Sequence, residues 1–157
     1  MTQKLEKTLT LLKKDILEMM SLTKSQIIRA KEALDKFDKG IAFEILSIEK
    51  RIDAFEIKIN IDCENILALY NPVAVDLRFV MAMYSINSDL ERIGDKAASI
   101  VRYIIDMEQP INININNILK VNDMFNHVLK MIDITETVML NEDTTLARQL
   151  FKEDLLL

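Results

Sequence analysis

The sequence of 157 residues is poor in the amino acids that make tight turns, since it has only 2 glycines and 2 prolines. Folds built from many short strands need such residues between the strands, so a β-sandwich or a barrel of hairpins is excluded. The sequence also has no glycine-rich phosphate loop and no nucleophile elbow. This composition predicts long helices joined by few breaks.

The chain has one cysteine, one histidine and no tryptophan. Cys63 cannot form an intramolecular disulfide, and its apolar neighbours in a helical pattern predict a core position. His127 has no glutamate three residues before it, so the Glu-x-x-His pairs of ferritin-like di-iron centres are missing. A carboxylate-bridged metalloenzyme is therefore disfavoured, and we expect a protein that is not an enzyme.

The charge balance and the hydropathy pattern limit the partners. The net charge is −5, without the basic excess that a nucleic-acid-binding surface needs. No stretch reaches the roughly 18 consecutive apolar residues of a membrane-spanning helix, and charges interrupt the N-terminal segment where a signal peptide is apolar. We expect a cytoplasmic protein that binds no nucleic acid and meets a membrane only through partners.

Apolar residues recur every three or four positions along three long stretches, which is typical of amphipathic helices. These stretches are residues 5–37, 41–69 and 80–104, with breaks at Gly40 and at Asn71-Pro72. Asn71 is expected to be the N-cap of the third helix. The pattern predicts an all-α fold, namely an antiparallel three-helix bundle of long helices.

The breaks divide the chain into three parts. Residues 1–108 form the three-helix bundle, residues 109–117 form an extended linker, and residues 118–157 hold one long helix and the start of another. The linker includes the alternating segment INININN, which has no partner strand elsewhere in the chain. The last part is expected to be an incomplete second bundle.

A weak internal repeat supports this division. At an offset of 105 residues, Ile41 falls on Leu146 and Ala42 falls on Ala147. A tandem helical repeat is indicated, in which the second copy lacks its third helix.

Two pairs of carboxylates lie beside the apolar stripes of the second and third helices. Glu49 and Asp53 form one pair, and Glu91 and Asp95 form the other. Residues four apart share a helix face, so each pair needs a compensating cation, either an arginine or a metal ion. Four converging carboxylates without histidine or cysteine suit hard or borderline cations such as Mg, Mn, Ca or Fe.

The alternative interpretation is a solvated acidic face. Arg51 and Arg92 are interleaved with these carboxylates, and such patterns commonly form incidental ion pairs. Gly94 lies inside the second motif, where a glycine costs about 0.5–1 kcal/mol relative to alanine. Close approach of another helix or of a cation is the expected reason for this glycine.

The segment NPVAVDLR (71–78), followed eleven residues later by DLERIGD (89–95), resembles the signature of the PhoU family of phosphate-transport regulators. The resemblance covers roughly residues 4–157. It implies a pair of tandem three-helix bundles and no enzyme active site. Asp76 and Arg78 match the family motif at the start of the third helix, where an acidic residue suits the helix dipole. We expect their role to be structural at least as much as functional.

The resemblance also implies a function. A PhoU-type protein is a cytoplasmic accessory of a phosphate-specific ABC transporter, and it restrains the phosphate-starvation response through a sensor histidine kinase. The acidic motifs of the family bind metal clusters, usually of iron or zinc and in some members Mg or Mn. The matching positions here are Glu49, Asp53, Glu91 and Asp95, with Asp89 as a candidate further ligand. The competing interpretation is a metal-free helical adaptor or oligomerisation protein.

The C-terminus departs from the family pattern. Asp154 takes the place of Glu49 in the second repeat, and the partner of Asp53 would lie just past Leu157. A second metal site is therefore not expected, and the sequence suits a fragment or a naturally short form. Uncovered apolar faces favour self-association, so we expect a homodimer or an exchanged-helix assembly.

Overall fold

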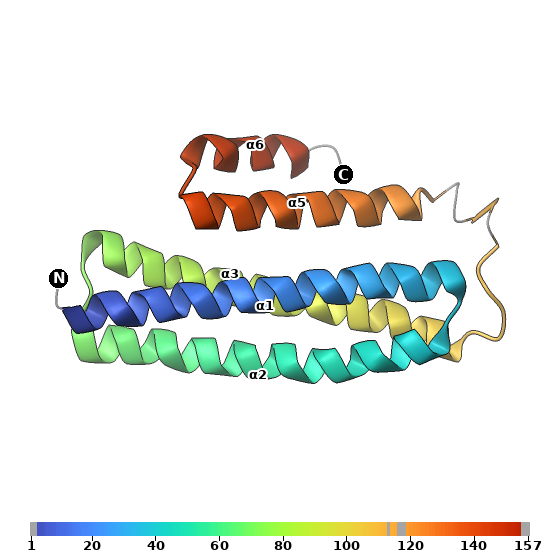
Figure 1. Ribbon diagram of the computed structural model, residues 1–157, viewed down its shortest axis with the longest axis horizontal. Helices are drawn as coiled ribbons and strands as arrows, with labels where there is room; N and C mark the ends of the chain where they lie inside the picture. Colours follow the sequence, from blue (N-terminus) through green and yellow to red (C-terminus); the bar gives the residue numbers. More distant parts are fainter. Residues whose placement is uncertain (1–2, 113, 116–118, 155–157) are drawn as a thin grey trace.

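The computed structural model describes residues 3–112, 114–115 and 119–154. Its helices are α1 (Gln3–Lys36), α2 (Lys39–Tyr70), α3 (Ala74–Asp106), α5 (Val121–Asn141) and α6 (Thr144–Asp154) (Figure 1). The described residues include no strand, so the all-α prediction is confirmed. Helices α1, α2 and α3 form the predicted antiparallel bundle.

The core of the bundle is built from the apolar stripes of its three helices. These helices have 34, 32 and 33 residues, so each is about 50 Å long at roughly 1.5 Å per residue. Burying one such side chain stabilises the fold by about 1.5–3 kcal/mol. The largest buried apolar side chains are Leu12, Ile16, Met19 and Met20 from α1, Ile45, Ile52, Ile59 and Ile66 from α2, and Val80, Val101 and Ile104 from α3.

Cys63 lies in this core, as predicted. Burial raises the pKa of its thiol to about 11, because the thiolate would lose its hydration. The thiol is therefore protonated at neutral pH and is a poor nucleophile.

The corner between α1 and α2 depends on Asp38. Its side chain accepts hydrogen bonds from the backbone N–H groups of Gly40 at 2.8 Å and Ile41 at 3.1 Å. Helix α2 therefore begins before Gly40, and the predicted break at this glycine is wrong. An aspartate at the N-cap stabilises the start of a helix more than a glycine does, because its carboxylate accepts hydrogen bonds from two N–H groups that would otherwise lack a partner.

The corner between α2 and α3 also differs from the prediction. Asn71 has the left-handed backbone conformation (φ 45°, ψ 55°) and ends α2 as its C-cap. Helix α3 begins only at Ala74, after Val73. The prediction that Asn71 caps the third helix is wrong, because asparagine tolerates the left-handed region and can end a helix there.

The corner between α5 and α6 repeats the geometry of the first corner. Asp143 lies 105 residues after Asp38, and its side chain accepts from the N–H groups of Thr145 at 2.9 Å and Leu146 at 3.0 Å. The preceding residue is left-handed in both corners, with φ 50° at Phe37 and φ 55° at Glu142. This correspondence supports the interpretation of α5 and α6 as a second copy of α1 and α2.

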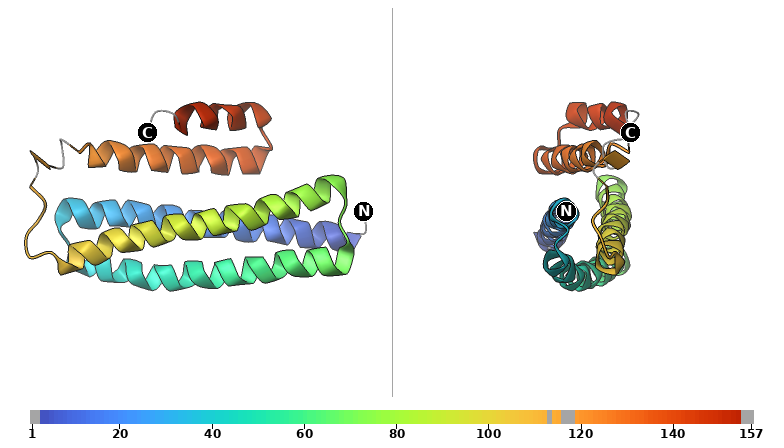
Figure 2. Two further views of the ribbon diagram at one scale, coloured as in Figure 1. Left: turned by 180° about the vertical axis from the view of Figure 1, so that it is seen from behind. Right: turned by 90° about the vertical axis from the view of Figure 1, so that its right-hand side faces the viewer.

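Helix α5 lies antiparallel to α1, and α6 folds back over the side of α5 that is remote from the bundle (Figures 1 and 2). Phe125 and Ile132 are the buried residues of α5. Ion pairs join Lys24 to Asp133, and Lys13 to Glu142 at 3.1 Å. Among the described residues, α6 packs only against α5.

Residues 107–120 connect α3 to α5. The predicted linker (109–117) falls within this connection, and the division into residues 1–108, 109–117 and 118–157 stays a prediction. Ile118, the predicted start of the fourth helix, lies outside the described residues, and the helix is observed from Val121. Within the described part of the chain, no helix has the length and hydropathy needed to cross a membrane.

Candidate metal site and docking groove

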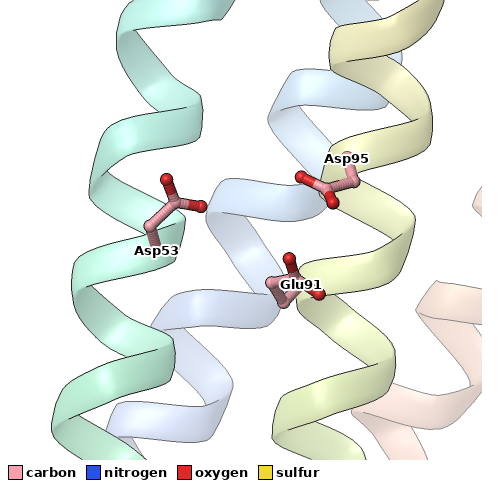
Figure 3. Close-up of side chains that lie close together, drawn as sticks. All are labelled: Asp53, Glu91 and Asp95. Atoms are coloured by element: carbon pink, nitrogen blue, oxygen red, sulfur yellow. The ribbon is translucent and has the colours of Figure 1, made fainter.

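Three carboxylates converge between α2 and α3 at about the middle of the bundle. Asp53 on α2, with Glu91 and Asp95 on α3, each place one carboxylate oxygen within 4.8 Å of the others (Figure 3). Asp53 and Asp95 are exposed, and Glu91 is half-buried. We refer to Asp53, Glu91 and Asp95 as the carboxylate cluster.

The local sequence explains why these side chains meet. Asp53 follows the buried Ile52, and Glu91 follows the buried Leu90. One residue further along a helix turns the side chain about 100° away from the core, to the edge of the packed face. Because α2 and α3 are packed antiparallel, these edges face each other.

Gly94 allows the helices to approach closely beside the cluster. A Cβ at this position would lie 3.0 Å from Oε1 of Gln26 on α1 and 3.2 Å from Cδ1 of Ile52 on α2. Both distances are shorter than ordinary carbon contacts of about 3.5–4.0 Å. Of the two expected reasons for this glycine, the structure therefore shows the close approach of other helices.

Burial raises the pKa of Glu91, and the nearby carboxylates of Asp95, Glu56 and Asp53 raise it further. A hydrogen bond between the Glu91 and Asp95 carboxyl groups requires a proton on one of them, and so it raises the pKa of Glu91 in the same direction. None of the ion pairs among the described residues involves a member of the cluster. The cluster therefore carries negative charge that no cation among the described residues neutralises by direct contact.

Glu49, the fourth predicted ligand, does not join the cluster. Nη2 of Arg102 on α3 donates to both oxygens of the Glu49 carboxylate, at 2.6 and 2.8 Å. The Glu49 side chain is only 16% exposed. The cation that compensates Glu49 is thus an arginine, and it is neither Arg51 nor Arg92.

Arg102 was missed by the sequence patterns. It lies seven residues after Asp95 on α3, which is two helical turns, so the two residues share a face. The seven-residue spacing could have shown that Arg102 and Asp95 share a face of α3. The sequence could not predict that Arg102 pairs with Glu49, because this pairing depends on the relative register of α2 and α3.

Asn87 is a second residue that sequence patterns missed. It lies one turn before Glu91, is fully buried, and its Nδ2 donates to the backbone O of Glu56 and to Oδ1 of Asn60, both at 2.9 Å. A buried donor that loses its partners costs free energy, so the two hydrogen bonds from Nδ2 of Asn87 favour one register of α3 against α2. Asn87 thereby helps to place Asp53 opposite Glu91 and Asp95.

The other predicted site residues lie outside the cluster. Asp89 is exposed and lies 3.6 Å from Arg92. Asp76 is in the first turn of α3, where its charge suits the helix dipole, and Arg78 is exposed two residues later. Asp89, Asp76 and Arg78 are not members of the carboxylate cluster, and the role of Asp76 stays a prediction.

The donor set of the cluster consists of carboxylate oxygens alone. Oxygen ligands fit Mg²⁺, Mn²⁺ and iron, whereas structural zinc sites are built from cysteine and histidine. The residues present therefore fit a hard or borderline cation held by Asp53, Glu91 and Asp95. Such a cation would neutralise the cluster and link α2 to α3.

A second feature lies on the opposite side of α3. Three cavities of about 390, 370 and 290 Å³ lie between α3 and α5, and residues of α1 line each of them. Ile100, Val121 and Phe125 line two of the cavities, which are therefore adjoining. All residues around the 370 Å³ cavity are apolar except Lys96. We refer to the residues of α3 and α5 that line the three cavities as the α3/α5 groove.

The long antiparallel bundle with an acidic site between its second and third helices defines the class of protein. Residues 16–104 match the family model described as the PhoU domain, and they include the whole carboxylate cluster. The match extends over more than half of the chain. The chain therefore belongs to the PhoU domain family.

Particular relatives extend the similarity beyond that domain. The chain is 35% identical to a protein of Aquifex aeolicus named "Phosphate-specific transport system accessory protein PhoU homolog", over 96% of this chain and 67% of the relative. It is 30% identical to homolog 1 of Thermotoga maritima, over 95% of this chain and 64% of the relative.

A solved structure shows the same fold. The crystal structure of PhoU from Pseudomonas aeruginosa matches with a TM-score of 0.83 and 28% identity, over 92% of this chain and 68% of that one. The chain thus spans about two thirds of the length of these similar proteins.

Proposed function

We propose that the chain is a PhoU-type regulator of phosphate uptake and of phosphate-starvation signalling. In this role it acts in the cytoplasm as a metal-binding adaptor between a phosphate-specific ABC transporter and a sensor histidine kinase. The observation that carries the transport role is the similarity to accessory proteins of phosphate-specific transport systems over 95% or more of the chain. The kinase partner is what the resemblance of the two sequence motifs implies.

The chemistry of the described residues supports an adaptor. The cluster offers only carboxylate oxygens, which bind cations but do not by themselves form a nucleophile–base pair. Cys63 is buried with a raised pKa and so is a poor nucleophile.

Metal binding is proposed at the carboxylate cluster, with Asp53, Glu91 and Asp95 as ligands. The supporting observations are the 4.8 Å limit on the distances between their oxygens and the absence of direct ion pairs to them in the described chain. A cation bound only by the folded state stabilises it, by about 2.7 kcal/mol at a concentration 100 times the Kd. Mg²⁺, Mn²⁺ and iron are the cations that this donor set favours.

Self-association is proposed through the α3/α5 groove, with a second copy of the chain as the partner. The groove is largely apolar, and α5 leaves Met124 and Leu140 more than half exposed. A groove lined by apolar side chains, with exposed apolar residues beside it, suits the apolar core of a protein–protein interface.

The competing function is a metal-free structural adaptor. The observation that favours it is the pair between Glu49 and Arg102, which neutralises one predicted ligand without a metal. The two functions differ in the metal content of the purified protein and of an Asp53→Asn, Asp95→Asn variant. Bound metal that disappears in the variant supports the regulator with a metal site, and negligible metal in both supports the metal-free adaptor.

The regulatory role is tested in cells that lack the gene for this chain. Expression of phosphate-starvation genes at high phosphate is expected in the deletion strain, and reintroduced wild-type chain is expected to repress it. Unchanged expression after deletion and after complementation would contradict the role.

A further inference from the structure

The pair between Glu49 and Arg102 lies next to the carboxylate cluster and competes with it. Glu49 and Asp53 are four residues apart on α2, so their side chains leave the same face of that helix. Arg102 and Asp95 are two turns apart on α3, also on one face. The antiparallel register places Glu49 opposite Arg102 and Asp53 close to Asp95.

Both oxygens of Glu49 are already used by Arg102, at 2.6 and 2.8 Å. Hydrogen bonds between a guanidinium and a carboxylate are among the stronger ones in proteins, and low exposure of Glu49 reduces competition from water. A cation bound to an oxygen of Glu49 would lie beside the positive guanidinium of Arg102, which repels the cation and holds the carboxylate toward itself. The pair is thus a direct competitor for the fourth carboxylate of the motif.

We infer that Arg102 sets the cation affinity of the carboxylate cluster, because it withholds Glu49 from the site and leaves three carboxylates as ligands. The inference rests on the proposed metal binding at this site. Arg102 acts as a positioning residue, since its contact is with Glu49 and not with the cluster. The positive charge of Arg102, two turns from Asp95, also repels a cation at the cluster and so lowers the cation affinity further.

Two consequences follow from this competition. Removal of the arginine frees Glu49 and raises the number of available carboxylates from three to four, so cation affinity increases. Removal of Glu49 leaves the three cluster carboxylates in place, so cations still bind, but removal of Arg102 then has little further effect.

The chain offers a matched control for the charge of Arg102. Arg92 lies on the same helix, next to Glu91 in the sequence, and its exposed side chain is 3.6 Å from Asp89. Arg92→Gln removes the same charge from α3 without releasing Glu49. The effect of freed Glu49 is therefore the difference between the Arg102→Gln and the Arg92→Gln variants.

The experiment is a titration of the full chain with Mn²⁺, in which electron paramagnetic resonance measures the free ion. The proteins are the wild type, Arg102→Gln, Arg92→Gln, Glu49→Gln and the double variant Glu49→Gln, Arg102→Gln. We expect Arg102→Gln to bind Mn²⁺ on the order of tenfold more tightly than the wild type, because the variant gains Glu49 as one further charged ligand. We expect Arg92→Gln to change the Kd less than about threefold, as for an exposed charge.

The double-variant cycle separates the ligand from the charge. The tenfold gain is expected to fall to the level of Arg92→Gln when Arg102→Gln is made in the Glu49→Gln protein. Circular dichroism of each variant checks that it is folded. Arg102→Lys keeps the charge but not the planar donor geometry, so its Kd for Mn²⁺ is expected to lie between those of the wild type and Arg102→Gln. A purely structural role of Arg102 would not produce this intermediate Kd.

Failure of the inference and failure of the proposed metal site have different signatures. If the wild type binds Mn²⁺ and Arg102→Gln matches Arg92→Gln, or if the gain persists without Glu49, the inference is overturned while the metal site stands. If neither the wild type nor Arg102→Gln binds Mn²⁺, the proposed metal site is overturned and the inference falls with it.

Discussion

The side chain of Gln26 on α1 lies directly against the backbone of Gly94 on α3. Its Oε1 would be only 3.0 Å from a Cβ at that position. This contact brings α1 to the inner side of the same turn of α3 that carries Glu91 and Asp95. Gly94 therefore links the packing of α1 inside the bundle to the geometry of the carboxylate cluster.

Gly94→Ala is expected to destabilise the protein by up to about 2 kcal/mol, because overlap of the new methyl group with Gln26 and Ile52 costs about 1–3 kcal/mol. The higher helix propensity of alanine offsets about 1 kcal/mol of this cost. Urea unfolding followed by circular dichroism measures the change. A variant as stable as the wild type would show that Gln26 and Ile52 move aside freely.

Gln26→Met is expected to be neutral or to stabilise the protein by about 1 kcal/mol. The Gln26 side chain is fully buried, and neither its Oε1 nor its Nε2 has a hydrogen-bond partner in the described chain. Replacement by an apolar side chain of similar shape removes the cost of burying these atoms. The midpoint of urea unfolding measures the effect, and a loss of more than 1 kcal/mol would contradict this account.

The stability of the metal-free protein is expected to fall as the pH rises through the titration of Glu91. Burial and the neighbouring carboxylates raise the pKa of Glu91 in the folded state above its value in the unfolded chain. The folded state then binds more protons than the unfolded state between these two pKa values, so stability decreases with rising pH across that window. Thermal unfolding in the presence of a chelator, at a series of pH values, measures this slope.

Glu91→Gln removes the titrating group and is expected to flatten this slope. Asp89→Asn is the control, since Asp89 lies on the same helix outside the cluster. An equal slope in the wild type and in Glu91→Gln would contradict the assignment.

Added Mn²⁺ is expected to raise the Tm of the wild type and to leave that of Asp53→Asn, Asp95→Asn unchanged. At 100 times the Kd, the stabilisation of about 2.7 kcal/mol corresponds to roughly 5–11 °C for a chain of this size. Differential scanning fluorimetry measures the shift. Asp89→Asn is the matched control and is expected to retain the full shift, because Asp89 pairs with Arg92 outside the cluster.

Ile100→Glu is expected to weaken self-association through the α3/α5 groove by at least tenfold. Ile100 lines two adjoining cavities, and a carboxylate there would be desolvated in an interface. Multi-angle light scattering across a concentration series measures the monomer fraction. Ile57→Glu, on the exposed surface of α2, is expected to have no effect. A wild type that is monomeric at all concentrations would contradict the proposed interface.

Much of the fold could be predicted from the sequence, since the apolar stripes locate α1, α2 and α3 and their buried faces. The errors occur at the corners. Asp38 rather than Gly40 marks the start of α2, and Asn71 ends α2 instead of starting α3. Polar residues that accept hydrogen bonds or tolerate left-handed geometry act at either end of a helix, so local sequence does not decide which end they serve.

The candidate site, like the fold, could be predicted only in part from the sequence. The sequence by itself determined that two carboxylate pairs lie at the edges of packed helix faces, because residues four apart on one helix share a face whatever the helix packs against. Only the tertiary structure decided that Asp53 meets Glu91 and Asp95 while Glu49 meets Arg102. The physical reason is that contacts between helices depend on their register, which is fixed by the whole interface between α2 and α3, including Gly94 and the buried amide of Asn87.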